Sequence, residues 1–330
     1  MDTDAAVAGA IVLAAGFGSA ILTALARRWL GGAAILDRPG ARSSHATPVP
    51  RGAGLAIVAV LAAAWLGLAV RHLIPPDSVV VALAAVALAL LSFVDDWRGL
   101  SVAVRLLAHS AAVIVALAFF PRDALVFQGW LPLPLDRAAA VLLWVWFVNL
   151  YNFMDGIDGI TGIETACVGL GAVVVAFAGG RDVAVAALAA TAVALGFLRF
   201  NWQPATVFLG DAGSVPLGYA MGWLLLVLAR EGLWAPALIL PLYYLADATV
   251  TLARRAARGE TPWRAHRDHF YQRALRGNDH AAVARLVLAG DVGLAALALL
   301  ALAWPLVAVG LAVILVAALL AHMARRGAAA

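Results

Sequence analysis

Long apolar stretches separated by short polar segments run along the whole chain. A helix that crosses a bilayer needs about 20 mostly apolar residues, and the pattern predicts eleven such segments. The last two are separated only by Trp304-Pro305, so a bundle of ten helices is the alternative. The segments lie near residues 5–26, 55–73, 79–94, 102–120, 138–150, 160–178, 183–198, 214–229, 233–252, 284–303 and 305–323.

The composition supports a membrane protein. Of the 330 residues, 64% are hydrophobic and only 13% are charged, whereas a soluble domain carries about 25% charged residues. We therefore expect an all-α, polytopic integral membrane fold that forms one domain over residues 1–330. Asp2 and Asp4 precede the first apolar segment, so we expect a membrane helix there rather than a cleavable signal peptide.

The arginines are distributed unevenly between the two sides of the predicted bundle. All 23 basic residues are arginine, and only Arg71, Arg122, Arg137, Arg181 and Arg230 fall on one side. Cytoplasmic loops carry an excess of basic residues. The arginine-rich side is therefore predicted to be cytoplasmic, with the N-terminus outside and the C-terminus inside.

The most polar motif follows the fifth apolar segment. It reads Asn149-Leu-Tyr-Asn-Phe-Met-Asp-Gly-Ile-Asp-Gly159, with two amides and two carboxylates in eleven residues. Burying these groups at a membrane boundary is costly unless they have partners. A divalent cation with phosphate ligands would offset the cost, and the glycines would let both carboxylates face one pocket.

Two further acidic positions lie at predicted helix ends. Asp95 and Asp96 repel each other and face the negative end of the helix dipole, so a cation nearby would stabilise them; a solvated turn is the alternative. Asp211 lies between glycines before the eighth segment. It could bind a metal while the following amides favour an anion, or it could be an ordinary helix cap.

The loop between the first two segments, residues 36–54, combines arginines, hydroxyls, a histidine and glycines. This composition is typical of phosphate binding, although a polar loop that satisfies the positive-inside rule would look similar. The candidate ligands are Arg42, Ser44, His45 and Arg51.

The loop at 254–285 contains Trp263-Arg-Ala-His-Arg-Asp-His-Phe-Tyr-Gln-Arg273. His266 and His269 would share one face of a helix, but without a cysteine or a third nearby ligand, zinc fits poorly. A phosphate clamp that includes Arg267 fits the arginines better, and a basic stretch on anionic lipid is the alternative. Asp247, inside the ninth segment, has either a structural or a catalytic role.

All the polar clusters in the predicted loops map to the arginine-rich side. This arrangement predicts an active site open to the cytoplasm, with an oxygen-ligated metal and anionic substrates, and no nucleic-acid partner. A transporter is the competing class, but it needs a site near the midplane with access from both sides.

The motifs resemble, in the same order along the chain, those of the polyprenyl-phosphate N-acetylhexosamine-1-phosphate transferases, glycosyltransferase family 4. The resemblance implies a bundle of ten or eleven helices in the bacterial inner membrane, with cytoplasmic active-site loops. The matching motifs are Leu36-Asp-Arg-Pro, Arg42-Ser-Ser-His45, Pro50-Arg-Gly52, Asp95-Asp96, Asn149 to Gly159, Leu209-Gly-Asp-Ala-Gly-Ser214 and His266-Arg-Asp-His269.

The resemblance also implies an activity. The family transfers a HexNAc-1-phosphate, here of the GlcNAc or 6-deoxy-HexNAc type, from a UDP-sugar to undecaprenyl phosphate in the membrane and releases UMP. Mg²⁺ is the implied cofactor, with Mn²⁺ as a substitute, and a homodimer is the implied assembly. The His266-Arg-Asp-His269 loop resembles the initiators of lipopolysaccharide O-antigen synthesis. The phospho-MurNAc-pentapeptide transferase of peptidoglycan synthesis is the alternative.

Roles for single residues follow from the same resemblance. Asn152 and Asp211 match the magnesium ligands, and Asp155 and Asp158 match the nucleotide-sugar region. Phosphate and sugar contacts are implied for the two basic loops described above. The doublet of Asp95 and Asp96 matches a pair implicated in catalysis or in handling the lipid phosphate. Asp95 would accept the residual proton of the lipid phosphate or act as a covalent nucleophile, and we favour direct attack by the lipid phosphate.

Overall fold

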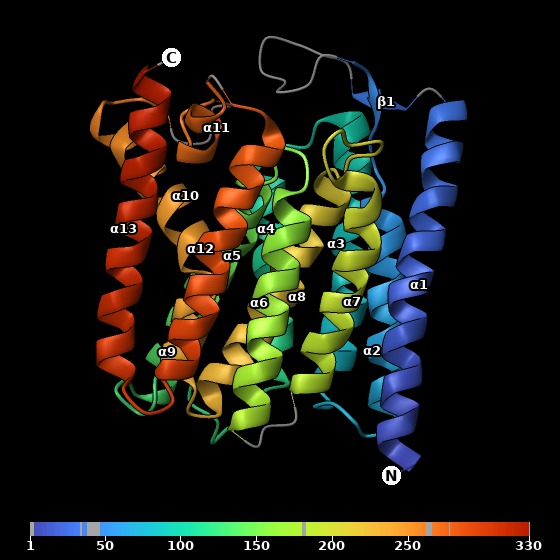
Figure 1. Ribbon diagram of the computed structural model, residues 1–330. Helices are drawn as coiled ribbons and strands as arrows, with labels where there is room; N and C mark the ends of the chain where they lie inside the picture. Colours follow the sequence, from blue (N-terminus) through green and yellow to red (C-terminus); the bar gives the residue numbers. More distant parts are fainter. Residues whose placement is uncertain are drawn as a thin grey trace.

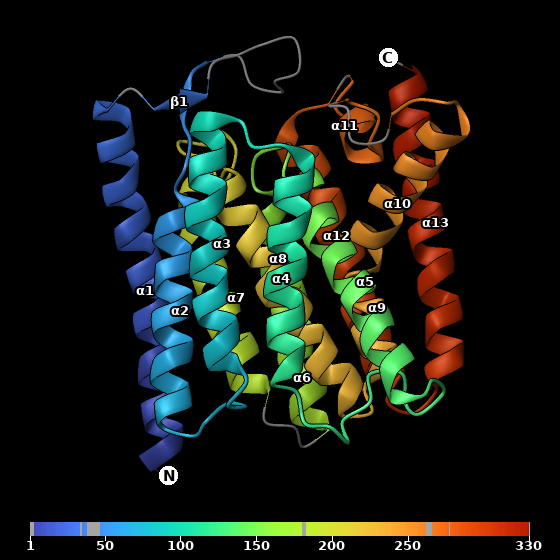
Figure 2. The ribbon, with the colours of Figure 1, turned by 180° about the vertical axis from the view of Figure 1, so that it is seen from behind.

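The computed structural model describes residues 3–33, 35–37, 47–179, 183–261, 266–276 and 278–329, which form a bundle of helices standing side by side (Figures 1 and 2). Eight of the described helices are long and apolar enough to cross a membrane. They are α1 (Thr3–Gly32), α3 (Ser78–Arg98), α5 (Leu133–Phe153), α6 (Ile160–Ala178), α7 (Ala184–Asn201), α8 (Asp211–Arg230), α12 (His280–Leu300) and α13 (Pro305–Ala329).

Shorter apolar helices complete the bundle. They are α2 (Gly54–Val70), α4 (Val102–Ala118), α9 (Trp234–Ile239) and α10 (Leu242–Ala257). Together the described helices cover every apolar segment expected from the sequence, and the all-α, polytopic membrane fold is confirmed.

One apolar segment differs from its expected form, and the question left open at the last two segments is answered. The ninth segment was expected to be continuous, but a turn at Leu240 and Pro241 divides it into α9 and α10. Proline has no amide hydrogen to donate and clashes with the preceding helical turn, which explains the break. The last two segments are separate helices joined by a turn at Ala301 to Trp304, so the ten-helix alternative is wrong.

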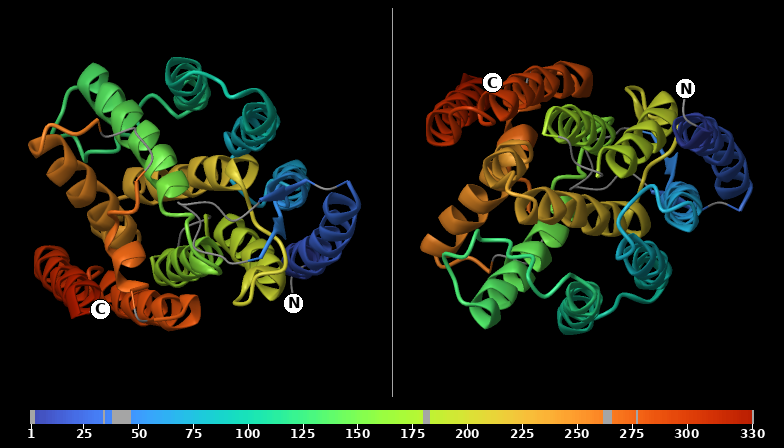
Figure 3. Two further views of the ribbon diagram at one scale, coloured as in Figure 1. Left: turned by 90° about the horizontal axis from the view of Figure 1, so that it is seen from above. Right: turned by 90° about the horizontal axis from the view of Figure 1, so that it is seen from below.

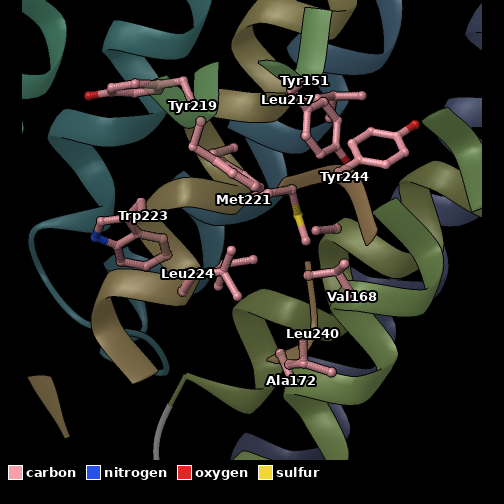
Figure 4. Close-up of a cluster of buried hydrophobic side chains, with 14 of the residues drawn as sticks. Tyr151, Val168, Ala172, Leu217, Tyr219, Met221, Trp223, Leu224, Leu240 and Tyr244 are labelled. Atoms are coloured by element: carbon pink, nitrogen blue, oxygen red, sulfur yellow. The ribbon is translucent and has the colours of Figure 1, made fainter. Parts of the chain in front are cut away.

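Helix α8 forms the centre of the bundle (Figure 3), and all its residues from Ala212 to Ala229 are buried. Small residues allow close packing: a Cβ at Gly218 would lie 2.6 Å from Cβ of Tyr151 on α5. Trp144 stacks on Tyr219 with ring centroids 4.8 Å apart and donates to its carbonyl. Figure 4 shows the buried cluster around Tyr219 and Met221. Such contacts hold membrane helices together where lipid provides little hydrophobic driving force.

Two short strands and a short helix lie at the same end of the bundle (Figure 1). There, β1 (Leu36–Asp37) pairs antiparallel with β2 (Val49–Pro50), and the short helix α11 (Phe270–Ala274) lies near the end of α13. The C-terminus lies at this end and the N-terminus at the other. The bundle thus presents the loops expected to carry chemistry on a single face.

Candidate active site

The first basic loop is tied to the segment that precedes α8. Phe208 donates its backbone N–H to the carbonyl of Pro50 at 2.7 Å, and Gly54 donates to the carbonyl of Leu209 at 3.0 Å. A Cβ at Gly54 would collide with the backbone of Gly213, so only glycine allows the start of α2 to approach the start of α8 so closely. These contacts bring residue 51 against residue 211.

Arg51 forms ion pairs with two of the predicted site residues. Its Nη2 lies 2.7 Å from Oδ1 of Asp211 and 3.1 Å from Oδ1 of Asp96. Burial by itself would lower the pKa of the Arg51 guanidinium, but the charges of Asp211 and Asp96 outweigh burial and raise this pKa. Arg51 is therefore the positive partner that the sequence required near the Asp95–Asp96 doublet.

The two aspartates of the doublet point to different partners. Oδ1 of Asp95 accepts the backbone N–H of Leu100 at 2.5 Å, and Oδ2 lies 3.4 Å from Nη1 of Arg105 on α4. Asp96 instead reaches Arg51. Neighbouring residues on a helix lie about 100° apart, which accounts for this division. Of the two, Asp96 is the one that contacts Arg51 and, through Arg51, is linked to Asp211.

The Asn149–Gly159 motif ends α5 and enters a tight turn before α6. The Asn152 Nδ2 donates to the Ser214 hydroxyl at 3.0 Å, and that hydroxyl donates to the carbonyl of Gly210 at 3.3 Å. Oδ1 of Asp155 accepts from the Thr161 hydroxyl at 2.7 Å. Burial, strengthened by the charge of Asp211, raises the pKa of Asp155 to about 6.

Asp158 faces a histidine that belongs to α12. Oδ1 of Asp158 lies 3.0 Å from Nδ1 of His280, and its Oδ2 accepts the backbone N–H of Ala205 at 2.9 Å. Gly159 has a φ of +80° and donates its N–H to Asn201 at 3.0 Å. The glycine turn thus directs both carboxylates of the motif toward neighbouring loops.

Two adjoining cavities lie among these residues. The smaller, about 240 Å³, is lined by groups that include Arg51, Asn152, Asp155 and Asp211. The larger, about 660 Å³, is lined by polar residues of the loops at 203–208 and 267–280. Both cavities share the side chains of Asp158, Phe208, Gln272 and His280.

The smaller cavity contains oxygen atoms of the kind that bind Mg²⁺. Among the described residues, no group of three or more histidine, cysteine or acidic side chains is close enough to hold a metal ion. However, Asn152, Asp155 and Asp211 line one cavity. Asn152 Oδ1, Asp155 Oδ2 and Asp211 Oδ2 have no protein hydrogen-bond partner in the described part of the chain. Mg²⁺ often binds through one or two carboxylates while keeping water or phosphate ligands. These oxygens fit that mode.

The segment around α11 is anchored by Asp247 from α10. The Asp247 carboxylate accepts the backbone N–H groups of Phe270 at 3.0 Å and Tyr271 at 3.1 Å, and Oδ1 lies 3.2 Å from Nδ1 of His269. The Tyr271 hydroxyl donates to the carbonyl of Phe153 at 3.1 Å. Asp247 therefore has the structural role, because it fixes a loop to the site.

The three predicted residues of this loop have different surroundings. Arg267 lines the larger cavity, whereas the linings of both cavities lack His266 and His269. The two histidine rings stack with centroids 4.9 Å apart. Burial, with help from His269, lowers the pKa of His266 to about 4, so this ring is neutral at pH 7. Arg42, Ser44 and His45 lie outside the described residues.

The sequence of this chain is similar to that of a known protein family. The sequence model described as glycosyl transferase family 4 matches residues 78–229, which contain both acidic motifs and Asp211. Over this stretch, which is less than half of the chain, the sequence is similar to glycosyltransferase family 4. The match ends before the loop of His266 and begins after Arg51, so those residues join the site through the tertiary contacts described above.

Curated relatives carry two kinds of names. A phospho-N-acetylmuramoyl-pentapeptide-transferase of Lacticaseibacillus paracasei is 33% identical over 192 residues, which cover 53% of this chain and 59% of that protein. A probable undecaprenyl-phosphate N-acetylglucosaminyl 1-phosphate transferase of Bacillus subtilis is 27% identical over 211 residues, covering 59% and 57%. An undecaprenyl-phosphate alpha-N-acetylglucosaminyl 1-phosphate transferase of Escherichia coli K12 is 27% identical over 258 residues, covering 73% and 69%. The matched stretches span little more than half of the first two relatives.

Several residues that line this site were not expected from the sequence. His280, Gln272 and Phe208 contribute to both cavities, and Asn201 binds the glycine turn. The polar run Asn278-Asp279-His280 before an apolar helix was the one available signal for His280. Its pairing with Asp158, 122 residues away, became visible only in the folded chain.

Proposed function

We propose that this chain transfers a HexNAc-1-phosphate from a UDP-sugar to undecaprenyl phosphate, forming an undecaprenyl-diphosphate-sugar and UMP. The observation that carries the proposal is the convergence of Arg51, Asn152, Asp155 and Asp211 on one cavity at the polar end of the bundle. The names of the relatives, which include two N-acetylglucosaminyl 1-phosphate transferases, support it. The product would begin a cell-surface polysaccharide such as a lipopolysaccharide O-antigen.

The chemical problem is the meeting of two anions. A phosphate monoester has a second pKa of about 6, so the lipid phosphate is mostly dianionic at neutral pH and needs little deprotonation. It needs neutralised charge and in-line alignment with the β-phosphorus of the UDP-sugar. A site rich in guanidinium groups and cation ligands provides both.

The proposed metal is Mg²⁺, held by Asn152 and Asp211, with Asp155 facing the same cavity. When bound, Mg²⁺ would neutralise the diphosphate and stabilise the departing UMP. Arg51 contacts Oδ1 of Asp211, which leaves Oδ2 for the cation. The Ser214 hydroxyl holds the Asn152 amide so that its oxygen is left as a ligand.

The larger cavity suits the nucleotide-sugar. Phe208 offers an aromatic ring, Asp158 and His280 offer paired hydrogen-bonding groups, and Arg267 offers a positive charge for phosphate. Because both cavities share Phe208 and Asp158, a diphosphate could reach from the larger cavity to the metal ligands. His266 and His269 would then act indirectly, since they hold the loop that positions Arg267.

We propose a different role for each aspartate of the Asp95–Asp96 doublet. Asp96 would hold Arg51 in place, and Asp95, held by Arg105, would handle the lipid phosphate. We favour direct attack by the lipid phosphate over a covalent intermediate on Asp95. Incubation with UDP-sugar but without lipid acceptor should then leave no phosphosugar attached to the protein. An adduct trapped on Asp95 would replace direct attack by the two-step route.

The proposed setting is the bacterial inner membrane, with the polar end of the bundle facing the cytoplasm and the N-terminus outside. The arginine asymmetry supports this orientation. A homodimer is the proposed assembly.

The decisive experiment is a panel of radiolabelled UDP-sugars assayed for transfer to undecaprenyl phosphate, with Mg²⁺, with Mn²⁺ and with chelator. We expect transfer from UDP-GlcNAc or a 6-deoxy-HexNAc analogue that chelation abolishes. The panel also includes UDP-MurNAc-pentapeptide, because a relative that is 33% identical carries the phospho-MurNAc-pentapeptide name. Transfer of that substrate alone would favour the peptidoglycan reaction, and the absence of any transfer would refute the proposed function.

A further inference from the structure

A separate arginine-lined cavity lies between the end of α10 and α11; Figure 2 shows where these two helices lie in the bundle. Its volume is about 280 Å³, and its charged lining consists of Arg254, Arg258, Arg273, Arg276 and Asp268. The four arginines come from two elements: two lie one turn apart at the end of α10, and two lie on α11 and the turn after it. The proposed transfer chemistry assigns no role to Arg254, Arg258 or Arg273.

The charges in this cavity are unevenly compensated. Asp268 pairs with Arg255, and Glu260 pairs with both Arg255 at 2.8 Å and Arg258 at 2.7 Å. Arg254 and Arg273, in contrast, have no acidic partner in the described part of the chain. The cavity therefore contains guanidinium groups whose mutual repulsion an anion would relieve.

Arg254 is also held in place before any ligand binds. The Arg254 guanidinium lies over the Phe270 ring, 4.9 Å from its centroid. The backbone of Phe270 is fixed by Asp247, as described for the active site. A freely solvated basic face would lack this ordering, so the cavity is better suited to a defined ligand than to a diffuse ion cloud.

Size and position indicate the kind of anion. Pockets for drug-sized molecules occupy about 300–1,000 Å³, so this cavity suits a small polar group rather than a complete nucleotide-sugar. It lies at the basic end of α10, where arginines follow the apolar part of the helix, and negative lipid headgroups attract basic residues placed next to an apolar segment. We propose that the four-arginine cavity binds the phosphate of an anionic membrane phospholipid, at a site separate from the transfer reaction.

The cavity has a physical connection to the active site. Arg276 lines both this cavity and the larger catalytic cavity. Asp268, which also lines the arginine cavity, lies between His266 and His269 in the loop that presents Arg267. A bound lipid phosphate would therefore order the same loop that contributes to the active site.

Lipid binding to the full chain in detergent tests the proposal without relying on enzyme activity. The purified protein is titrated with short-chain phosphatidylglycerol, phosphatidylcholine or inorganic phosphate, while its thermal unfolding is followed. We expect a saturable rise in the unfolding midpoint with phosphatidylglycerol alone. In the variant Arg254→Gln/Arg273→Gln, the affinity should fall by at least roughly tenfold, since hydrogen bonds to charged groups contribute on that scale.

The matched control is Arg28→Gln/Arg325→Gln, which removes the same charge from two exposed positions outside the cavity. It should bind phosphatidylglycerol like the unmodified protein. If the control loses as much affinity as the cavity variant, general surface charge explains binding and the site is refuted. An equal effect of inorganic phosphate would overturn the lipid assignment. Native mass spectrometry of retained lipid provides a second measurement if the cavity variant is too unstable for unfolding experiments.

Discussion

Arg51 and Asp211 lie 160 residues apart in the sequence, yet Nη2 of Arg51 is 2.7 Å from Oδ1 of Asp211. The guanidinium thus occupies one oxygen of the carboxylate that we propose as a metal ligand. A cation and a guanidinium compete for the same negative charge. The first basic loop is therefore coupled directly to the proposed Mg²⁺ site.

Replacing Arg51 should affect metal binding and turnover in opposite directions. In Arg51→Gln, the Mg²⁺ concentration for half-maximal UMP release should fall several-fold because Asp211 loses its competitor. The maximum rate should fall by roughly 100-fold, the scale seen when a group that stabilises developing charge is removed. Arg105→Gln is the comparison, since Arg105 contacts Asp95 rather than Asp211. An unchanged Mg²⁺ midpoint in Arg51→Gln would contradict the competition.

Asp211 itself should be essential for the metal-dependent reaction. Asp211→Asn keeps the size of the side chain but removes the charge that attracts Mg²⁺, so UMP release should drop at least roughly 100-fold. Elution from a sizing column and thermal unfolding should stay close to those of the unmodified protein. Asp4→Asn, at the opposite end of the bundle, provides the matched control. Near-normal turnover in Asp211→Asn would refute the metal assignment.

Asp247 should contribute strongly to stability because it is buried and accepts two backbone N–H groups. Asp247→Ala leaves both donors unsatisfied, and each unpaired buried group costs about 1–3 kcal/mol. The free energy of unfolding in detergent should fall accordingly. Asp247→Asn retains one acceptor oxygen and should lose less, so the order of the two variants tests the interpretation. Equal stability of all three proteins would show that Asp247 does not anchor the loop.

Gly156 should tolerate no side chain while Tyr271 keeps its hydroxyl. A Cβ at position 156 would collide with that hydroxyl, and overpacking typically costs about 1–3 kcal/mol. Gly156→Ala should therefore lower stability and activity. The double variant Gly156→Ala/Tyr271→Phe should recover part of the loss, although it gives up the bond to Phe153, worth about 1 kcal/mol. Strictly additive effects in this double-mutant cycle would exclude the proposed contact.

His266 should make stability depend on pH. Its pKa is lowered to about 4 in the folded protein, whereas an unfolded histidine titrates near 6.5. Between these values the unfolded chain binds more protons, so the free energy of unfolding should fall as the pH drops from about 6.5 to about 4. Above about pH 6.5 the ring is neutral in both the folded and the unfolded chain, so no stability is lost there. His266→Gln should flatten this part of the stability profile, and an unchanged profile in His266→Gln would contradict the assignment.

Much of the candidate site could be predicted from the sequence. The acidic doublet, the Asn149–Gly159 motif and Asp211 are local combinations whose burial cost is visible from their apolar flanks. Their placement at one end follows from counting apolar segments, and the fold bears out that placement. The break between α9 and α10 was missed because an apolar run with one internal proline resembles a continuous membrane helix.

The sequence by itself determined the membrane class and the number and order of the apolar segments, because each depends on residues close together along the chain. Only the tertiary structure decided the pairings. In the folded chain, Arg51 pairs with Asp96 and Asp211, His280 pairs with Asp158, and His269 pairs with Asp247. These contacts join helices that the sequence leaves independent. A buried charge can be compensated by any distant partner of opposite sign, and only the packing of the helices selects which one.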